Sequence, residues 1–238
     1  MKNNAVEIQN NYYTSTANTY DRNHVNSLMD RGHNFNLYFL SSMIDLFQIK
    51  SILDVGSGTG RTIEFIRNKH PEVKVVGIEP VQGLRQQAYE KGIPMDVIIA
   101  GDGNKIEFED GAFDLVCEFG MLHHVSNPER VVSEMIRVSS KAIFISDSNN
   151  FGQGGFIGRS TKQVINFFGL WKLFNYVKTK GKGYQISEGD GLFYSYSVFN
   201  NVNMIKEKCK SIYYLSSKNS GTNLYRSSSD IGLFALKK

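Results

Sequence analysis

The chain has 238 residues, of which 41% are apolar and 21% charged, and this composition excludes a disordered chain. Its net charge of only +4 gives no argument for a nucleic-acid partner, and its two cysteines are too few for a disulfide framework or a zinc cluster. No apolar run reaches the ~20 residues of a membrane span, and the first ten residues lack a secretion signal's apolar core. We therefore expect a single cytoplasmic domain over residues 1–238.

Helical and strand patterns alternate along most of the chain. Residues 1–50 are predicted to form a polar, partly irregular leader followed by a helix at 35–47. The other predicted elements are strands at 51–55, 73–78, 96–100, 113–117, 141–146, 211–216 and 231–236, and helices at 61–69, 81–91, 128–138 and 198–208. The alternation indicates an α/β fold with a Rossmann-like, doubly wound, mostly parallel sheet. The last two strands follow each other without a helix, which predicts an antiparallel edge.

A glycine-rich turn, residues 54–60 (DVGSGTG), follows the first strand. At this end of a doubly wound sheet, glycines let a ligand approach closely and the next helix offers free N–H groups. A dinucleotide fingerprint would need a third glycine where the chain has Arg61, which argues against an NAD-dependent or nucleotide-sugar enzyme. Glu79 ends the second strand and could accept hydrogen bonds from a ribose diol. Asp102 follows the third strand and could accept from an adenine amino group, with the Gly103 N–H nearby.

These segments resemble the successive motifs of class I S-adenosylmethionine-dependent methyltransferases. The resemblance covers about residues 35–147 and rests on LDVGSGTG, VVGIEP, IAGDG and FDLVCEFGMLHHV. It implies a seven-stranded sheet, S-adenosylmethionine as the cofactor and S-adenosylhomocysteine as the product. The residues it implies around the cofactor are Asp54, Gly56, Ser57, Gly58 and Gly60 at the methionine half, Glu79 and Pro80 at the ribose, Asp102 and Gly103 at the adenine, Glu118 or Phe119 near the methyl, and Tyr20 as a cover. Tyr20 could equally be an exposed or core-packing tyrosine.

Two adjacent histidines, His123 and His124, follow the fourth strand, where this fold places the methyl acceptor. A hydroxyl acceptor needs a base, most often histidine, whereas an amine can bind already neutral. Asp147 follows the fifth strand and could fix the tautomer of an adjacent imidazole. Some sugar and natural-product O-methyltransferases of this class have a similar pair. We predict that one histidine is the base and Asp147 its partner, while the other packs or caps the next helix; no metal site is predicted.

Residues 148–197 interrupt the alternation and are predicted to form an inserted cap. Between 148 and 187 there are six basic residues and no acidic one, and 161–178 is predicted to be a helix with a wide apolar face, mildly broken by Gly169. This helix either packs on the sheet edge as a lid, docks on a membrane through 161–182, or grips an anionic or lipid-linked acceptor. Residues of this cap predicted to bind the acceptor, or else to form ordinary turns, are Asn149, Glu188, Asp190, Tyr194 and Tyr196.

The sequence as a whole predicts methyl transfer from S-adenosylmethionine to a small molecule. The preferred acceptor is a hydroxyl of a sugar or a polysaccharide precursor, by analogy with the family. An N-methyltransferase, a nucleic-acid methyltransferase and a non-catalytic cofactor-binding protein that holds a partner remain as alternatives. A nucleic-acid substrate is disfavoured, because EFGMLHH stands where amino-directed enzymes carry an Asn/Asp-Pro-Pro-aromatic run. If the cap docks on a membrane, the expected place is its inner, cytoplasmic surface.

Overall fold

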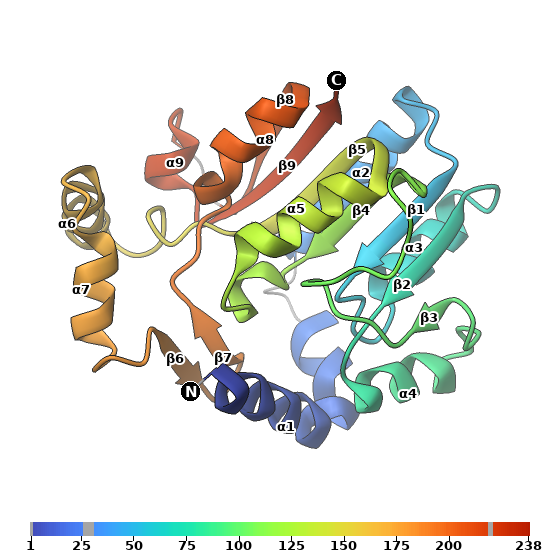
Figure 1. The fold of residues 1–238 in the computed structure, drawn as a ribbon, viewed down its shortest axis with the longest axis horizontal. Coiled ribbons are helices and arrows are strands. Elements are labelled where there is room, and N and C mark those ends of the chain that lie inside the picture. Colours follow the sequence, from blue (N-terminus) through green and yellow to red (C-terminus); the bar gives the residue numbers. More distant parts are fainter. Residues whose placement is uncertain (1, 26–30, 219–220) are drawn as a thin grey trace.

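The computed structural model describes residues 2–25, 31–218 and 221–238, and a mostly parallel sheet forms their centre (Figure 1). Within these residues the sheet has seven strands in the order β3-β2-β1-β4-β5-β9-β8. They are β1 (Ser51–Val55), β2 (Lys74–Ile78), β3 (Ile98–Ile99), β4 (Phe113–Phe119), β5 (Ser139–Ser148), β8 (Cys209–Lys218) and β9 (Asp230–Lys237). Strands β1 to β5 pair in parallel, and β9 runs antiparallel to both β5 and β8. The predicted doubly wound sheet with an antiparallel edge is confirmed.

Helices cover both faces of this sheet because each carries an apolar stripe at helical spacing. On one face α2 (Arg31–Leu46), α3 (Arg61–Lys69) and α4 (Gln82–Glu90) bury Leu40, Ile63 and Ala88. On the other face α5 (Pro128–Val138) and α8 (Val202–Lys208) bury Met135 and Ile205. Short 3-10 turns at Leu122–His124 (η3) and Val198–Asn201 (η4) follow β4 and precede α8. Cys117 and Cys209 are both buried and neither forms a disulfide.

The N-terminal segment is helical, so the predicted irregular leader is wrong where the structure describes it. Helix α1 (Lys2–Tyr20) continues into a π-helical turn at Asp21–Val25 (η1), and residues 26–30 of the predicted leader lie outside the described residues. Asn, Thr and Tyr are weak helix formers, so packing must stabilise α1. Ala17 packs against Val81 and Leu84. Helix α1 thereby crosses the carboxyl end of the sheet, between α4 and the hairpin of β6 (Tyr184–Ser187) and β7 (Gly191–Tyr194) (Figure 1).

Residues 148–197 form a projecting helix pair and a hairpin. The break predicted at Gly169 is complete rather than mild: this residue, with a φ of 72°, separates two helices, α6 (Phe156–Phe167) and α7 (Trp171–Lys178), and the first begins before the predicted start at 161. Neither helix buries a residue, and α6 packs on α9 (Leu224–Ser227) rather than on the sheet edge. The hairpin of β6 (Tyr184–Ser187) and β7 (Gly191–Tyr194) lies against α1. None of the described helices is both long enough and apolar enough to cross a membrane.

Candidate active site

The glycine turn after β1 is fixed against the end of β2. The Gly56 N–H donates to the Ile78 carbonyl at 2.9 Å, and the Gly58 N–H donates to Oε2 of Glu79 at 2.9 Å. Gly56 has a φ of 72°, and a Cβ there would lie 2.6 Å from Cγ of Met121. Only glycine fits this position without strain. The Val81 N–H completes the arrangement by donating to Oε1 of Glu79 at 2.8 Å.

A cleft opens beside this turn, at the carboxyl ends of the parallel strands. The sheet and α4 form one wall, and α1 forms the wall opposite. Glu79 lies in this cleft and is 5% exposed; burial raises the pKa of its carboxyl, against the two backbone hydrogen bonds that lower it. Each of its oxygens accepts one N–H and keeps a lone pair for a ligand hydroxyl. The other predicted cofactor residues that line the cleft are Tyr20, Gly56, Gly58, Pro80, Asp102, Gly103 and Phe119.

A smaller pocket adjoins the turn and holds Asp54, with Ser57 also in its wall. Asp54 is 1% exposed, and its Oδ1 accepts from the Cys117 thiol at 3.7 Å. Its Oδ2 accepts no hydrogen bond from any residue that the structure describes. Burial raises the pKa of this carboxyl to about 7, although the Arg61 guanidinium opposes the rise. A buried carboxylate with one unsatisfied oxygen fits a ligand ammonium group.

Two of the predicted cofactor residues, Gly60 and Glu118, line neither the cleft nor the smaller pocket, and a third, Asp102, also holds a turn of the backbone. Gly60 allows Ile93 to pack closely against the turn, because a Cβ at position 60 would lie 2.3 Å from Cδ1 of Ile93. Glu118 is fully buried and accepts the N–H groups of Met121 and Ser146 at 2.9 and 3.0 Å, so it holds the chain after β4 against β5. Burial raises its pKa well above the ordinary range. Asp102 does line the cleft, but it is exposed and accepts from the Asn104 N–H at 2.8 Å.

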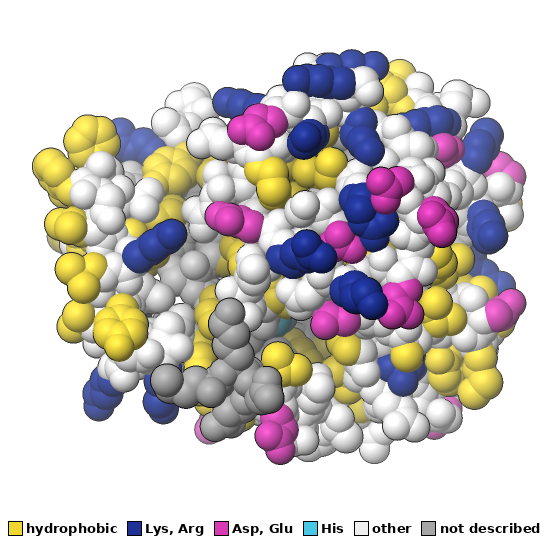
Figure 2. All heavy atoms as spheres, in the orientation of Figure 1, with side chains coloured by type: hydrophobic (Ala, Val, Ile, Leu, Met, Phe, Trp, Pro, Cys, Tyr) yellow, Lys and Arg dark blue, Asp and Glu magenta, His cyan; other side chains and the backbone are white. Residues whose placement is uncertain are grey.

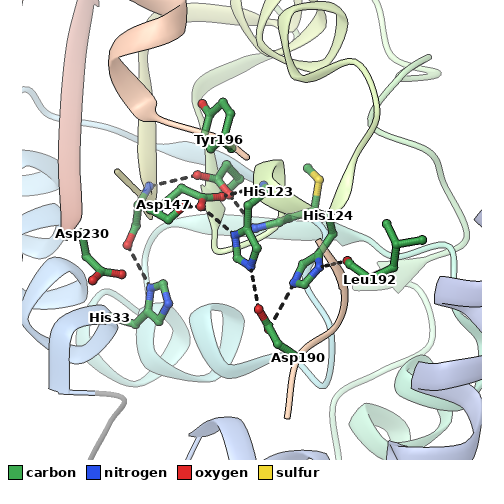
Figure 3. Close-up of polar contacts among 12 residues, drawn as sticks. His33, His123, His124, Asp147, Asp190, Leu192, Tyr196 and Asp230 are labelled. Atoms are coloured by element: carbon green, nitrogen blue, oxygen red, sulfur yellow. Dashed lines mark hydrogen bonds and ion pairs between the residues drawn. The ribbon is translucent and has the colours of Figure 1, made fainter. Parts of the chain in front are cut away.

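The two histidines meet two carboxylates where β4 and β5 end (Figure 3). The Nδ1 atom of His123 lies 2.7 Å from Oδ1 of Asp147, and the Nδ1 atom of His124 lies 2.7 Å from the Leu192 carbonyl. Both Nε2 atoms face Asp190, at 3.4 Å from His123 and 3.5 Å from His124. The structure thus brings together the three residues predicted for catalysis and adds Asp190 from the hairpin. We call His123, His124 and Asp190 the histidine cluster.

Charge in the cluster is balanced by its own members. Burial alone would lower the pKa of His123, but the carboxylates of Asp147 and Asp190 outweigh it and raise that pKa well above its ordinary value. Burial would likewise raise the pKa of Asp190, and the two imidazoles reverse this and lower it. The two carboxylates therefore favour the protonated form of His123. Of the two histidines, only His124 lines the cleft.

The residues predicted to bind the acceptor lie in three different settings: at the site, buried in the fold, or exposed. Asp190 belongs to the histidine cluster and Tyr194 lines the cleft. Asn149 is fully buried, and its Nδ2 donates to the carbonyls of residues 225 and 228 at 2.9 and 2.8 Å. Tyr196 is also buried and donates to Oδ1 of Asn201 at 3.0 Å. Glu188 is exposed and touches the site region only through its carbonyl, which accepts the Tyr12 hydroxyl. Asn149 and Tyr196 therefore hold the fold together and leave no free polar atom for an acceptor.

Tyr20 is the only residue of α1 that was predicted as a site residue, because the segment was expected to be partly irregular. Oε1 of Gln9 accepts the Leu192 N–H at 2.6 Å, and its Nε2 lies 3.0 Å from Nδ1 of His124. The Tyr13 hydroxyl lies 3.0 Å from Nε2 of the same imidazole. Positions 9, 13 and 20 repeat at helical spacing, which could have indicated a common face. His33 was missed too; it lies 3.0 Å from the Ser146 hydroxyl, and burial lowers its pKa to about 3.

The chain is similar to known methyltransferases in its central segment. Residues 53–142 match the family described as "Methyltransferase domain". Ajmaline N-methyltransferase of Rauvolfia serpentina is 33% identical over 103 residues, which is 40% of this chain and 34% of that protein. Phosphatidylethanolamine N-methyltransferase of Cereibacter sphaeroides is 30% identical over 118 residues, 43% of this chain and 51% of that protein. The chain thus matches only a third to a half of the length of these relatives.

Solved structures share the fold over nearly the whole chain. A possible histamine N-methyltransferase from Thermotoga maritima has a TM-score of 0.58 at 16% identity, covering 96% of this chain and 99% of that one. Magnesium protoporphyrin IX methyltransferase from Synechocystis, with S-adenosylhomocysteine bound, has a TM-score of 0.61 at 12% identity, covering 98% and 100%. At these identities the likeness establishes the fold alone.

Proposed function

We propose that this protein transfers a methyl group to a small molecule. Its residues 53–142 match a methyltransferase domain, and its sheet is that of class I S-adenosylmethionine-dependent methyltransferases. One observation carries the proposal. The glycine turn, the buried Glu79 and the unsatisfied Asp54 converge at one edge of the sheet, beside a cleft that ends at a histidine. No single one of these features is specific, but together they match the two ends of an adenosyl amino acid.

The residues of the cleft fit S-adenosylmethionine by their chemistry. Glu79 would accept the ribose hydroxyls through its remaining lone pairs, and Asp54 would pair with the ammonium of the methionine half. Tyr20 covers the turn at Gly58, since its hydroxyl lies 3.6 Å from where a Cβ of that residue would stand. When bound, S-adenosylmethionine supplies a methyl group on a positively charged sulfur, and the transfer leaves neutral S-adenosylhomocysteine.

The acceptor would bind at the end of the cleft nearest His124, with Tyr13 and Tyr194 beside it. The attacking oxygen or nitrogen forms the new bond to the methyl carbon as the bond from carbon to sulfur breaks, and a hydroxyl also releases its proton. His124 lines the cleft and belongs to the histidine cluster, so we propose that the cluster activates a hydroxyl acceptor. The sugar acceptor predicted from the sequence now depends on Asp190 and Tyr194 alone, so we propose a hydroxyl acceptor without assigning it to a sugar.

We further propose that the acceptor is lipid-linked and is reached at an anionic membrane surface. The surface formed by α6 and α7 exposes large apolar side chains; Phe167 is 84% exposed, Ile157 81% and Phe168 68%. Figure 2 shows apolar side chains gathered over these helices with basic ones beside them. Six basic residues and no acidic one in 148–187 fit a negatively charged layer. One similar protein is named for a lipid substrate, phosphatidylethanolamine.

Vesicle flotation tests the membrane contact. We expect the protein to float with phosphatidylglycerol vesicles at low salt, and the double variant Phe167→Ser/Phe168→Ser to stay at the bottom of the gradient. Leu46→Ser, which changes an apolar side chain of 69% exposure on α2, is the matched control and should float. Absence of flotation of the unaltered protein would dismiss the membrane contact without touching the methyl transfer.

Production of S-adenosylhomocysteine tests the activity itself. The protein is incubated with S-adenosylmethionine and panels of hydroxyl, amine and lipid-linked acceptors, and the product is quantified by mass spectrometry. We expect turnover with a hydroxyl acceptor and its loss in His123→Ala/His124→Ala. Turnover that survives in the double variant would remove the histidines from the reaction. Binding of S-adenosylhomocysteine without turnover on any panel would support a cofactor-binding partner protein instead.

A further inference from the structure

The histidine cluster is arranged as a set of metal ligands, although the sequence predicted no metal site. His123 and His124 come from η3 and Asp190 from the turn between β6 and β7, so the cluster joins segments far apart in the chain. One ligand atom of each lies within 4.8 Å of the others. We propose that these three side chains bind one divalent transition-metal cation, with zinc as the representative ion.

The orientation of both imidazoles supports this assignment. Each Nδ1 atom is 2.7 Å from a fixed acceptor, Asp147 for His123 and the Leu192 carbonyl for His124. Both partners are acceptors, so they favour the hydrogen of a neutral ring on Nδ1 and the lone pair on Nε2; at His124 the 2.7 Å contact with the carbonyl is shorter than the 3.0 Å contact with the Gln9 amide nitrogen. Both Nε2 atoms face the Asp190 carboxylate (Figure 3). Metal-binding histidines are held in this way, by a carboxylate or a carbonyl on the nitrogen that does not bind the ion.

The distances fit a tetrahedral ion better than direct hydrogen bonds. Charge-assisted N–H···O⁻ bonds are about 2.7–2.9 Å long, whereas Nε2 to Asp190 measures 3.4 and 3.5 Å. Zinc binds nitrogen and oxygen at about 2.0–2.1 Å, so two ligands at a tetrahedral angle are separated by about 3.3 Å. Two imidazoles and one carboxylate suit zinc and its neighbours, while magnesium and calcium prefer oxygen ligands.

Three protein ligands leave one position open, as in catalytic rather than structural zinc sites. His124 lines the cleft where the acceptor is proposed to bind, so an ion held by the cluster would lie beside the acceptor. A hydroxyl bound there would lose its proton at neutral pH, and the proton would leave to water past Asp190, whose side chain is 43% exposed. The inference rests on the proposed function for this role only; binding of the ion does not depend on it.

One contact works against the ion and gives a sensitive test. In the metal-free protein the Tyr13 hydroxyl donates to Nε2 of His124 at 3.0 Å. A cation must break this hydrogen bond before it can bind Nε2 of His124. Tyr13→Phe should therefore bind the ion about two- to tenfold more tightly than the unaltered protein. A role of the imidazoles in structure alone predicts no such gain.

The experiment uses the full chain without a histidine tag, dialysed against a chelator. Zn²⁺ is titrated by calorimetry, and Co²⁺ by its visible absorption, which reports tetrahedral nitrogen and oxygen ligands. We expect one ion per chain with a micromolar or lower Kd, and at least tenfold weaker binding in Asp190→Asn. The matched control is Asp45→Asn, because Asp45 is also a carboxylate 3.4 Å from an imidazole, that of His70. It should leave the affinity unchanged.

The outcomes separate this inference from the proposed function. No ion bound, or equal affinity in Asp190→Asn, overturns the cation site. Binding of S-adenosylhomocysteine by a chain that binds no Zn²⁺ overturns the cation site and keeps the methyl transfer. Binding of Zn²⁺ by a chain with no affinity for S-adenosylhomocysteine supports the site and overturns the methyl transfer. Circular dichroism of each variant shows whether a lost affinity reflects a lost fold.

Discussion

Replacing Glu79 with glutamine tests how the cleft holds its ligand. The carboxylate accepts the N–H groups of Gly58 and Val81, at 2.9 and 2.8 Å, and offers its other lone pairs to the cleft. Glutamine keeps one acceptor oxygen and puts an NH₂ group in place of the other. At that position one backbone N–H meets a second donor, and one ribose hydroxyl loses its acceptor.

A hydrogen bond to a charged group contributes about 1.5–3 kcal/mol. We therefore expect Glu79→Gln to bind S-adenosylhomocysteine roughly 10- to 150-fold more weakly in calorimetry. Glu72→Gln makes the same charge change at an exposed position before β2 and should bind normally. A folded Glu79→Gln protein whose affinity stays within twofold of the unaltered chain would refute the assignment of Glu79 to the ribose.

Two further substitutions test the turn and the buried acid. Gly56→Ala forces a Cβ to within 2.6 Å of Met121 at a φ of 72°, so the free energy of unfolding in urea should fall by about 1–3 kcal/mol; an unchanged value would contradict the turn geometry. Burial raises the pKa of Asp54 from 3.8 to about 7. Ionisation of this carboxyl is therefore less favourable in the folded than in the unfolded protein, and the folded state loses stability as the pH rises toward and through 7. The Tm of the unaltered protein should therefore fall relative to that of Asp54→Asn between pH 5 and pH 8, and parallel curves would contradict the burial.

The sheet could be predicted because its strands are short apolar runs that carry their own signal. Val75 and Ile78 in β2, for example, are buried on a strand whose pattern needs no knowledge of distant residues. Helix α1 could not be predicted in the same way. Its sequence favours no structure strongly, and it becomes helical against Val81, Leu84 and the β7 strand, which are neighbours only after folding.

The same contrast between local and long-range signals holds for the site. The spacing of the glycine turn, Glu79 and Asp102 places them at strand ends, so their meeting in one cleft followed from the fold class. Asp190 was expected near the acceptor but not between two imidazoles. That contact depends on the β6–β7 hairpin docking on α1 through Gln9, which joins residues 183 positions apart. Asn149 was misjudged because a polar residue after a strand looks the same whether it faces a ligand or, as here, buried backbone carbonyls.

A crystal structure of the chain grown with S-adenosylhomocysteine tests the central claim most directly. We expect the ribose hydroxyls on the Glu79 carboxylate and the ammonium of the homocysteine half on Asp54, with the sulfur directed toward the end of the cleft where His124 lies. A nucleoside bound elsewhere on the molecule, or a cleft that stays closed at saturating ligand, would contradict it.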